Sequence, residues 1–166
     1  MSVEQQLELA LRLLVALVLG AVVGLEREYH DHPAGLRTMA LVAFGSCLFT
    51  VAGAYVFGGR VTDPTRVAAQ VVTGIGFLGA GAILRTGNEI KGLTTAATIW
   101  VVAAIGMAVA YNLYILSALG TALVVGWLMG FRYIEQRFFD KEPIRRPRTG
   151  RRPDDPVDLR RPTEET

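Results

Sequence analysis

Residues 94–131 read TTAATIWVVAAIGMAVAYNLYILSALGTALVVGWLMGF, a run of 38 positions without a charged side chain. The run is broken only by the polar step Tyr111-Asn112. At about 1.5 Å per helical residue it covers roughly 57 Å, close to twice the ~30 Å hydrocarbon core of a bilayer. In lipid each backbone amide must find its partner within the segment, which restricts a short chain to helices. The sequence therefore predicts an all-α integral membrane protein.

Apolar runs along the chain of 166 residues predict one bundle of five transmembrane helices. The expected spans are Leu7–Leu25, Thr38–Phe57, Val67–Leu84, Thr94–Ala110 and Leu113–Phe131. The first span is the least regular, because Glu8 and Arg12 interrupt it; their i,i+4 spacing indicates an interfacial first turn. We assign residues 1–132 to this domain and residues 133–166 to a basic, proline-rich tail. The tail is too polar to bury a core and is expected to be disordered beyond about Asp140.

Turn residues separate the expected spans. Pro33-Ala34-Gly35 breaks the first connection, Gly58-Gly59 ends the second helix, and Asp63-Pro64 predicts the start of the third. The acidic start of the chain, Met1-Ser2-Val3-Glu4, differs from the basic start of a cleaved signal peptide. We therefore expect the first span to stay attached.

Lysine and arginine are distributed unevenly between the two sides of this bundle. With five spans and a cytoplasmic C-terminus, 14 basic residues lie in the cytoplasm, and the other three are Arg12, Arg60 and Arg66. An excess of Lys and Arg marks cytoplasmic connections. The sequence predicts that the N-terminus lies outside and the C-terminus in the cytoplasm.

Glycines concentrate in the third span, where Gly74-Ile75-Gly76-Phe77-Leu78-Gly79 matches the dinucleotide-binding fingerprint. That motif binds a pyrophosphate only where a strand turns into a helix, and this copy lies inside an uncharged span. Small residues instead let membrane helices approach closely, so we expect the third span to lie at the centre of the bundle. The glycines assigned to helix packing are Gly20, Gly24, Gly74, Gly76, Gly79 and Gly81. The pair Gly126/Gly130 has the same spacing, and internal packing and self-association both remain open.

Charged residues gather where the predicted cytoplasmic ends of the helices meet. They are Glu26, Arg27, Glu28, Arg37, Arg85, Glu89 and Lys91. Opposite charges at such a partly dry place attract more strongly than on an open surface, although ordinary snorkelling to the headgroups would explain the same pattern. Near the outer end of the third span, Arg66 and Gln70 form a smaller polar pair, and Gln70 lies deep enough to need a partner.

No pattern in the sequence predicts catalysis or a resident cofactor. Oxygen and imidazole groups that could bind Mg²⁺ occur at Glu26, Glu28, His30, Asp31 and His32. The two histidines are more simply interpreted as solvated loop residues, so we assign no metal site. Cys47 has no partner for an intrachain disulfide and is expected to be a buried thiol. No nucleophile, base and orienting group occur in a recognisable arrangement, which disfavours an enzyme. No Asp, Glu, Lys or His falls in the middle of a span, which disfavours a proton-coupled transporter.

Four strings of the sequence closely resemble the MgtC/SapB family of bacterial inner-membrane proteins. They are GLERE at 24–28, AGLRT at 34–38, RVAAQVVTGIGFLGAG at 66–81 and GLTTAATIW at 92–100. The resemblance implies a multi-pass protein linked to growth in low Mg²⁺ and, in some members, to survival inside host cells. Some members are thought to act on the F-type ATP synthase, and some are encoded beside P-type Mg²⁺ ATPases. Certain members continue into a folded cytoplasmic domain, where this chain has a short arginine-rich tail.

These observations lead to a non-enzymatic membrane regulator or accessory protein in Mg²⁺ homeostasis and membrane energetics, which acts by helix-to-helix contact with another membrane complex. Its expected surroundings are the lipid bilayer and such a complex, with no nucleic acid, and binding to a second copy of the chain stays open. The alternative is a passive pathway for Mg²⁺ or a small solute, lined by backbone carbonyls of the glycine-rich third helix. A scaffold that recruits acidic lipid or protein through the tail is the third interpretation.

Overall fold

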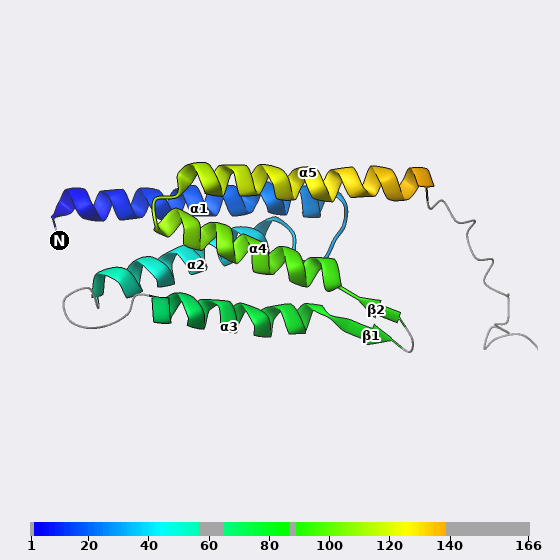
Figure 1. Cartoon of the computed structure of the whole chain (residues 1–166), viewed down its shortest axis with the longest axis horizontal. Helices are drawn as coiled ribbons and strands as arrows, with labels where there is room; N and C mark the ends of the chain where they lie inside the picture. The colour runs from blue at the N-terminus through cyan, green and yellow to red at the C-terminus, as the bar shows by residue number, and fades with distance from the viewer. Residues whose placement is uncertain (1, 57–64, 87–88, 139–166) are drawn as a thin grey trace, which may run out of the picture.

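The computed structural model describes residues 2–56, 65–86 and 89–138 (Figure 1). The predicted breaks at Gly58-Gly59 and Asp63-Pro64, and the tail from residue 139 onward, lie outside these ranges. The described residues form the helices α1 (Val3–Tyr29), α2 (Leu36–Val56), α3 (Thr65–Ala82), α4 (Leu93–Ala110) and α5 (Tyr114–Phe138). Between α3 and α4 lies a two-stranded antiparallel hairpin, β1 (Leu84–Thr86) and β2 (Glu89–Lys91).

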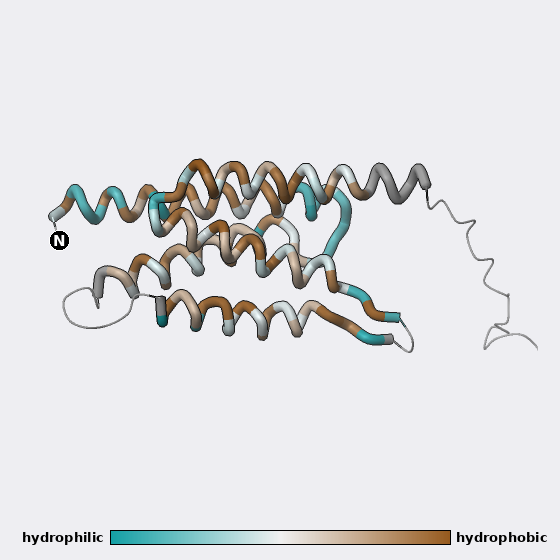
Figure 2. Tube along the Cα trace, in the orientation of Figure 1, coloured by the Kyte–Doolittle hydropathy of each residue, from teal (hydrophilic) through white to brown (hydrophobic). Residues whose placement is uncertain are grey.

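The helices lie side by side, and each runs opposite to the one before it (Figure 1). The connection between α1 and α2 and the β1–β2 hairpin share one end of the bundle, which we call the hairpin end. The start of α1 and the connection between α4 and α5 lie toward the opposite end, which we call the turn end. Hydrophobic residues follow the helices, and hydrophilic ones gather at their ends and on the hairpin (Figure 2).

Local signals explain where α1 begins and where α4 ends. Ser2 and Gln5 form a capping box at the start of α1, in which each side chain accepts a hydrogen bond from the backbone N–H of the other. At the end of α4, Asn112 adopts a left-handed φ of 63°, and the N–H of Leu113 donates to the carbonyl of Ala108 at 3.0 Å. This is the hydrogen-bond pattern of a Schellman motif, so the expected break at Tyr111-Asn112 is confirmed.

The helices have the length and composition of membrane spans. Among the described residues, Val3–Tyr29, Leu36–Ala54, Leu93–Ala110 and Tyr114–Phe131 are long and apolar enough to cross a bilayer. The apolar stretch of α3, Arg66–Ala82, is slightly shorter. The predicted all-α membrane bundle is confirmed, with one local correction. The third helix ends at Ala82 instead of Leu84, and Leu84 begins a strand whose register pairs it with Lys91.

The centre of the bundle lies where α1, α2 and α4 meet at Ala43. A Cβ atom on Gly20 of α1 would lie 2.7 Å from the Cβ of Ala43 and 2.6 Å from the carbonyl oxygen of Met39. On the other side, a Cβ on Gly106 of α4 would overlap the carbonyl oxygen of Ala43. Three helices therefore reach van der Waals contact here because two of them carry no side chain at the crossing.

The prediction that the third span lies at the centre is wrong. Half of the membrane-length window is buried in α2 and in α4, whereas α3 lies at the edge of the bundle and packs against α4 and α2 (Figure 1). On α3 only Ile75 and Gly79 are buried among the described side chains. The physical reason is that glycine permits close approach but does not drive it, since lipid is as apolar as the protein interior.

Candidate functional site

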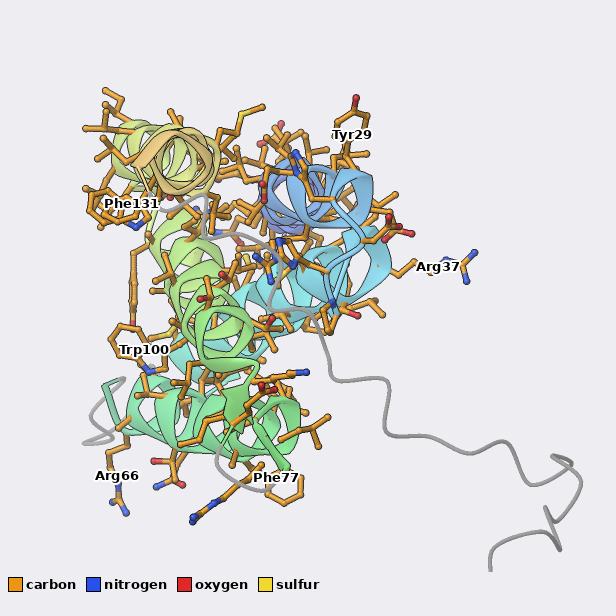
Figure 3. The ribbon with its side chains drawn as sticks, turned by 90° about the vertical axis from the view of Figure 1, so that its right-hand side faces the viewer. Tyr29, Arg37, Arg66, Phe77, Trp100 and Phe131 are labelled. Carbon is orange, nitrogen blue, oxygen red and sulfur yellow. The ribbon has the colours of Figure 1, made fainter. Side chains whose placement is uncertain are left out.

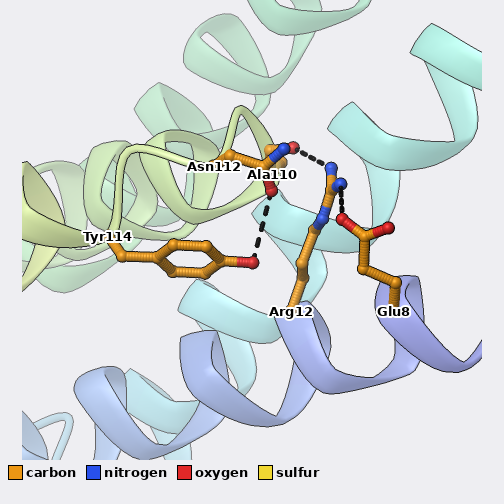
Figure 4. Close-up of polar contacts among 5 residues, drawn as sticks. All are labelled: Glu8, Arg12, Ala110, Asn112 and Tyr114. Atoms are coloured by element: carbon orange, nitrogen blue, oxygen red, sulfur yellow. Dashed lines mark hydrogen bonds and ion pairs between the residues drawn. The ribbon is translucent and has the colours of Figure 1, made fainter.

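Arg12 of α1 is buried at the turn end and binds the end of α4. Its Nη1 donates to the carbonyl oxygen of Ala110 at 2.9 Å, and its Nη2 to Oε1 of Glu8 at 2.6 Å (Figure 4). Only 7% of the Arg12 side chain is exposed, against 58% for Glu8. A cation at a helix C-terminus satisfies free carbonyls and opposes the negative end of the helix dipole. The i,i+4 pair of Glu8 and Arg12 is present, and Arg12 adds a buried contact between two helices that its spacing did not predict.

Arg27 makes a matching contact at the hairpin end. Its Nη2 donates to Oγ1 of Thr95, in the first turn of α4, at 2.8 Å, and the residue is 2% exposed. The two arginines are 15 residues apart on α1 (27 minus 12), and their targets are 15 apart on α4 (110 minus 95). At about 1.5 Å per residue, both separations are roughly 22 Å. Arg12 and Arg27 therefore fix α4 lengthwise against α1 at both ends.

Glu26 places a carboxylate next to Arg27 in the same buried region. Its Oε1 lies 3.1 Å from Nδ1 of His30, and its Oε2 is buried without a hydrogen-bond partner among the described residues. Nε of Arg27 is buried and unpartnered in the same way. Buried polar atoms usually have partners, and two of the four buried side-chain polar atoms that lack one among the described residues lie here.

The structure separates the predicted charged cluster into three parts. Glu26 and Arg27 are buried on α1, while Glu28 accepts a hydrogen bond at 2.9 Å from the N–H of Leu36 at the start of α2. Arg37 points away from the bundle (Figure 3). On the hairpin, Arg85 is exposed and Lys91 forms an exposed ion pair with Glu89 at 3.3 Å.

The glycines assigned to packing also behave differently from one another. Gly24 lies against the start of α2, where a Cβ would come within 2.6 Å of the Cα of Leu36, in the same way as Gly20 one turn earlier. On α3, Gly79 faces Ala96 of α4, but Gly74, Gly76 and Gly81 have no atom of the described chain within 4 Å of an added Cβ. These three glycines lie on the side of α3 that no other described helix covers.

Of the remaining predicted residues, Arg66 and Gln70 are both exposed on α3. No group of three or more His, Cys, Asp or Glu side chains within residues 2–56, 65–86 and 89–138 is arranged to hold a metal ion. Cys47 is fully buried against α1 and α4 residues such as Ala16 and Val109.

Sequence reasoning missed the residues that fix α4. Thr95 and Ala110 carry no signal of their own, because their role depends on which arginine the fold brings to them. Arg12 did carry one, since a charge in an apolar helix requires a partner in the bundle interior. Gly106 lies in an apolar run, as many other glycines of this chain do. Only its contact with the backbone of Ala43 in the folded bundle distinguishes it from them.

Comparison with known proteins identifies the family of this chain. The model of the MgtC family matches residues 13–137. This chain belongs to the MgtC family. The match begins at residue 13, one residue after Arg12, and it includes Arg27, Thr95, Ala110 and the whole of α3.

Several curated MgtC relatives are similar to this chain over most of its length. "Putative magnesium transporter YhiD" of Escherichia coli (strain K12) is 41% identical over 140 residues, which cover 81% of this chain and 65% of YhiD. The protein slr0014 of Synechocystis sp. is 46% identical over 118 residues, 71% of this chain and 50% of its own. "Protein MgtC" of Brucella abortus (strain 2308) is 46% identical over 110 residues, 66% of this chain and 45% of its own.

The chain thus spans about half to two thirds of the length of these relatives. No solved structure matches it. Family membership together with the apolar helices makes this chain a multi-pass membrane protein.

Proposed function

We propose that this protein is a non-enzymatic regulator or accessory factor in Mg²⁺ homeostasis and membrane energetics, and that it acts by contact between its helices and another membrane complex. The link to Mg²⁺ rests on the family and on the names of YhiD and MgtC. The resemblance implies an F-type ATP synthase or a P-type Mg²⁺ ATPase as the kind of complex involved. We place the protein in the bacterial inner membrane, with the N-terminus outside and the C-terminus in the cytoplasm.

The observation that carries the proposal is the uncovered surface of α3. Gly76 and Gly81 have no neighbour within 4 Å of an added Cβ, and Phe77 between them is 81% exposed and points away from the bundle (Figure 3). A small-residue surface allows another helix to approach closely, and the aromatic ring provides contact area. The buried contacts of α1, α2 and α4 do not depend on this surface.

The alternative, a passive pathway lined by α3 carbonyls, is favoured by the name of YhiD but is opposed by the backbone of α3. The helix is continuous from Thr65 to Ala82, so its interior carbonyls accept hydrogen bonds from its own N–H groups. Ion pathways in membrane proteins use carbonyls that are released from such bonding. Mg²⁺ flux through purified protein in liposomes would support the pathway, and a regulator alone should conduct nothing.

Site-directed photocrosslinking in cells tests the proposal. A photoreactive residue at Phe77 should capture a specific membrane protein, whereas one at Leu14 of α1, which is 56% exposed, should capture much less. Gly76→Leu should keep the fold but abolish both capture and growth in low Mg²⁺. Gly126→Leu on α5, also without neighbours within 4 Å, serves as the control. Equal capture at Phe77 and Leu14, or normal growth of Gly76→Leu, would refute the proposal.

A further inference from the structure

A groove with a volume of about 680 Å³ runs between α2 and α3. Apolar side chains form most of its walls: Leu41, Phe49, Val71, Ile75 and Leu78. Two glycines, Gly45 on α2 and Gly74 on α3, deepen it, because an added Cβ at either position would meet no atom within 4 Å. The volume lies within the range of ~300–1,000 Å³ that is typical of ligand sites.

The groove has a polar mouth at the hairpin end. Arg37 and Thr38 in the first turn of α2 line this end. The side chain of Arg37 is exposed and makes no ion pair with the residues that the structure describes. The nearby carboxylate of Glu28 accepts a hydrogen bond from the backbone at the start of α2 and forms no ion pair with Arg37. The guanidinium of Arg37 is therefore available to bind an anion at this mouth. Arginine binds phosphate oxygens through paired N–H donors.

The length of the groove corresponds to one leaflet of a bilayer. From Thr38 to Phe49 there are 11 helical steps, or about 17 Å, and half of a ~30 Å hydrocarbon core is about 15 Å. A membrane-spanning helix of ~10 Å diameter would occupy roughly 2,400 Å³, several times the volume of the groove. The dimensions therefore suit a slender chain better than a helix.

We propose that the groove binds one acyl chain of an anionic phospholipid, with the lipid phosphate on Arg37. Any lipid can cover an apolar wall, so selectivity must come from the charge at the mouth. Basic residues between membrane helices are known to bind acidic headgroups in this way. Ser46 lies along the same groove, and its buried hydroxyl has no protein partner among the described residues; Gln70 is the polar residue on the α3 wall.

Quenching of tryptophan by lipids with brominated acyl chains tests the proposal. Phe49→Trp places a reporter in the groove, and Phe77→Trp places one on α3 outside it, each in full-length protein with Trp100 and Trp127 changed to Phe. The two probes are brominated phosphatidylglycerol and brominated phosphatidylcholine in mixed vesicles. At the Phe49→Trp reporter we expect about fivefold stronger quenching by the anionic lipid, because one basic residue near the surface contributes ~1 kcal/mol. At the Phe77→Trp reporter we expect almost no preference.

Two sets of variants distinguish the contribution of the Arg37 charge to lipid binding from that of the groove volume. Arg37→Gln should remove the preference at Phe49 while leaving quenching by both lipids. The double variant Gly45→Leu/Gly74→Leu should fill the groove and lower quenching by both lipids. Gly126→Leu, at an open glycine on α5 outside the groove, should leave quenching at Phe49 unchanged. Size-exclusion profiles and helical content confirm that each variant is folded.

Three results would overturn the proposal. The first is the same lipid preference at Phe49 and Phe77, and the second is a preference that survives Arg37→Gln. The third is weak quenching at Phe49 by every lipid together with a dimer in detergent, which would identify a second copy as the occupant. Loss of partner capture at Phe77 leaves the lipid result unaffected, so this proposal and the proposed function fail separately.

Discussion

Replacing Gly106 by alanine should destabilise the protein more than the same change at any open glycine. The new Cβ would overlap the carbonyl oxygen of Ala43 and lie 2.9 Å from its carbonyl carbon and 3.0 Å from its Cα. These are backbone atoms of a helix, so they cannot rotate away as a flexible side chain would. Overpacking of this kind costs about 1–3 kcal/mol. Alanine favours a helix over glycine by about 1 kcal/mol, which offsets part of this cost.

The matched control is Gly126→Ala on α5. This glycine is exposed, and an added Cβ meets nothing within 4 Å, so only the helical preference of alanine remains. Equilibrium unfolding in mixed detergent micelles, followed by helical content, should place Gly106→Ala at least about 1 kcal/mol below Gly126→Ala in free energy of unfolding.

A second substitution shows which atoms of Ala43 cause the conflict. Ala43→Gly removes the methyl group that faces Gly20 but leaves the backbone oxygen that faces Gly106. It should therefore partly rescue Gly20→Ala and leave Gly106→Ala as unstable as before. If Gly106→Ala matches the control in stability, or if Ala43→Gly rescues it, the three-helix crossing has been wrongly located.

The other predictions concern the arginine contacts and the orientation. Thr95→Val removes the acceptor of Arg27 and should lower the unfolding free energy by about 1–3 kcal/mol, while the exposed Thr94→Val should have little effect. Arg12→Gln should speed hydrogen exchange in the last turn of α4 and leave its first turn unchanged; equal acceleration at both would contradict the assigned contact. In whole cells without Cys47, an impermeant thiol reagent should label Ser2→Cys but not Glu89→Cys, and the reverse result would invert the topology.

The sequence was sufficient for the membrane class, for five helices and for the turn at Tyr111-Asn112. These features depend on properties that single segments carry, such as an uncharged run of spanning length and a residue that tolerates a left-handed φ. The hairpin from Leu84 to Lys91 was missed because three-residue strands leave almost no periodic pattern.

The arrangement of the helices could not be predicted in the same way. Gly76 of α3 and Gly106 of α4 both lie in apolar runs, yet one faces open space and the other a backbone oxygen. A small residue shows where a helix can be approached, and the partner is decided by the rest of the bundle. The buried contacts of Arg12 and Arg27 are long-range, so they appear only once α1 and α4 lie antiparallel.

The polar contacts and the glycine crossings divide the bundle into an inner and an outer part. α1, α2 and α4 meet at Ala43, and the arginines of α1 bind both ends of α4. α3 and α5 add to this unit from outside, with residues such as Phe77 and Ile115 more than 80% exposed. Since lipid offers no hydrophobic penalty for that exposure, a partner helix or a lipid can bind α3 without breaking an inner contact. The proposed action by helix contact requires such a division, because a partner must bind the outer surface while the inner fold persists.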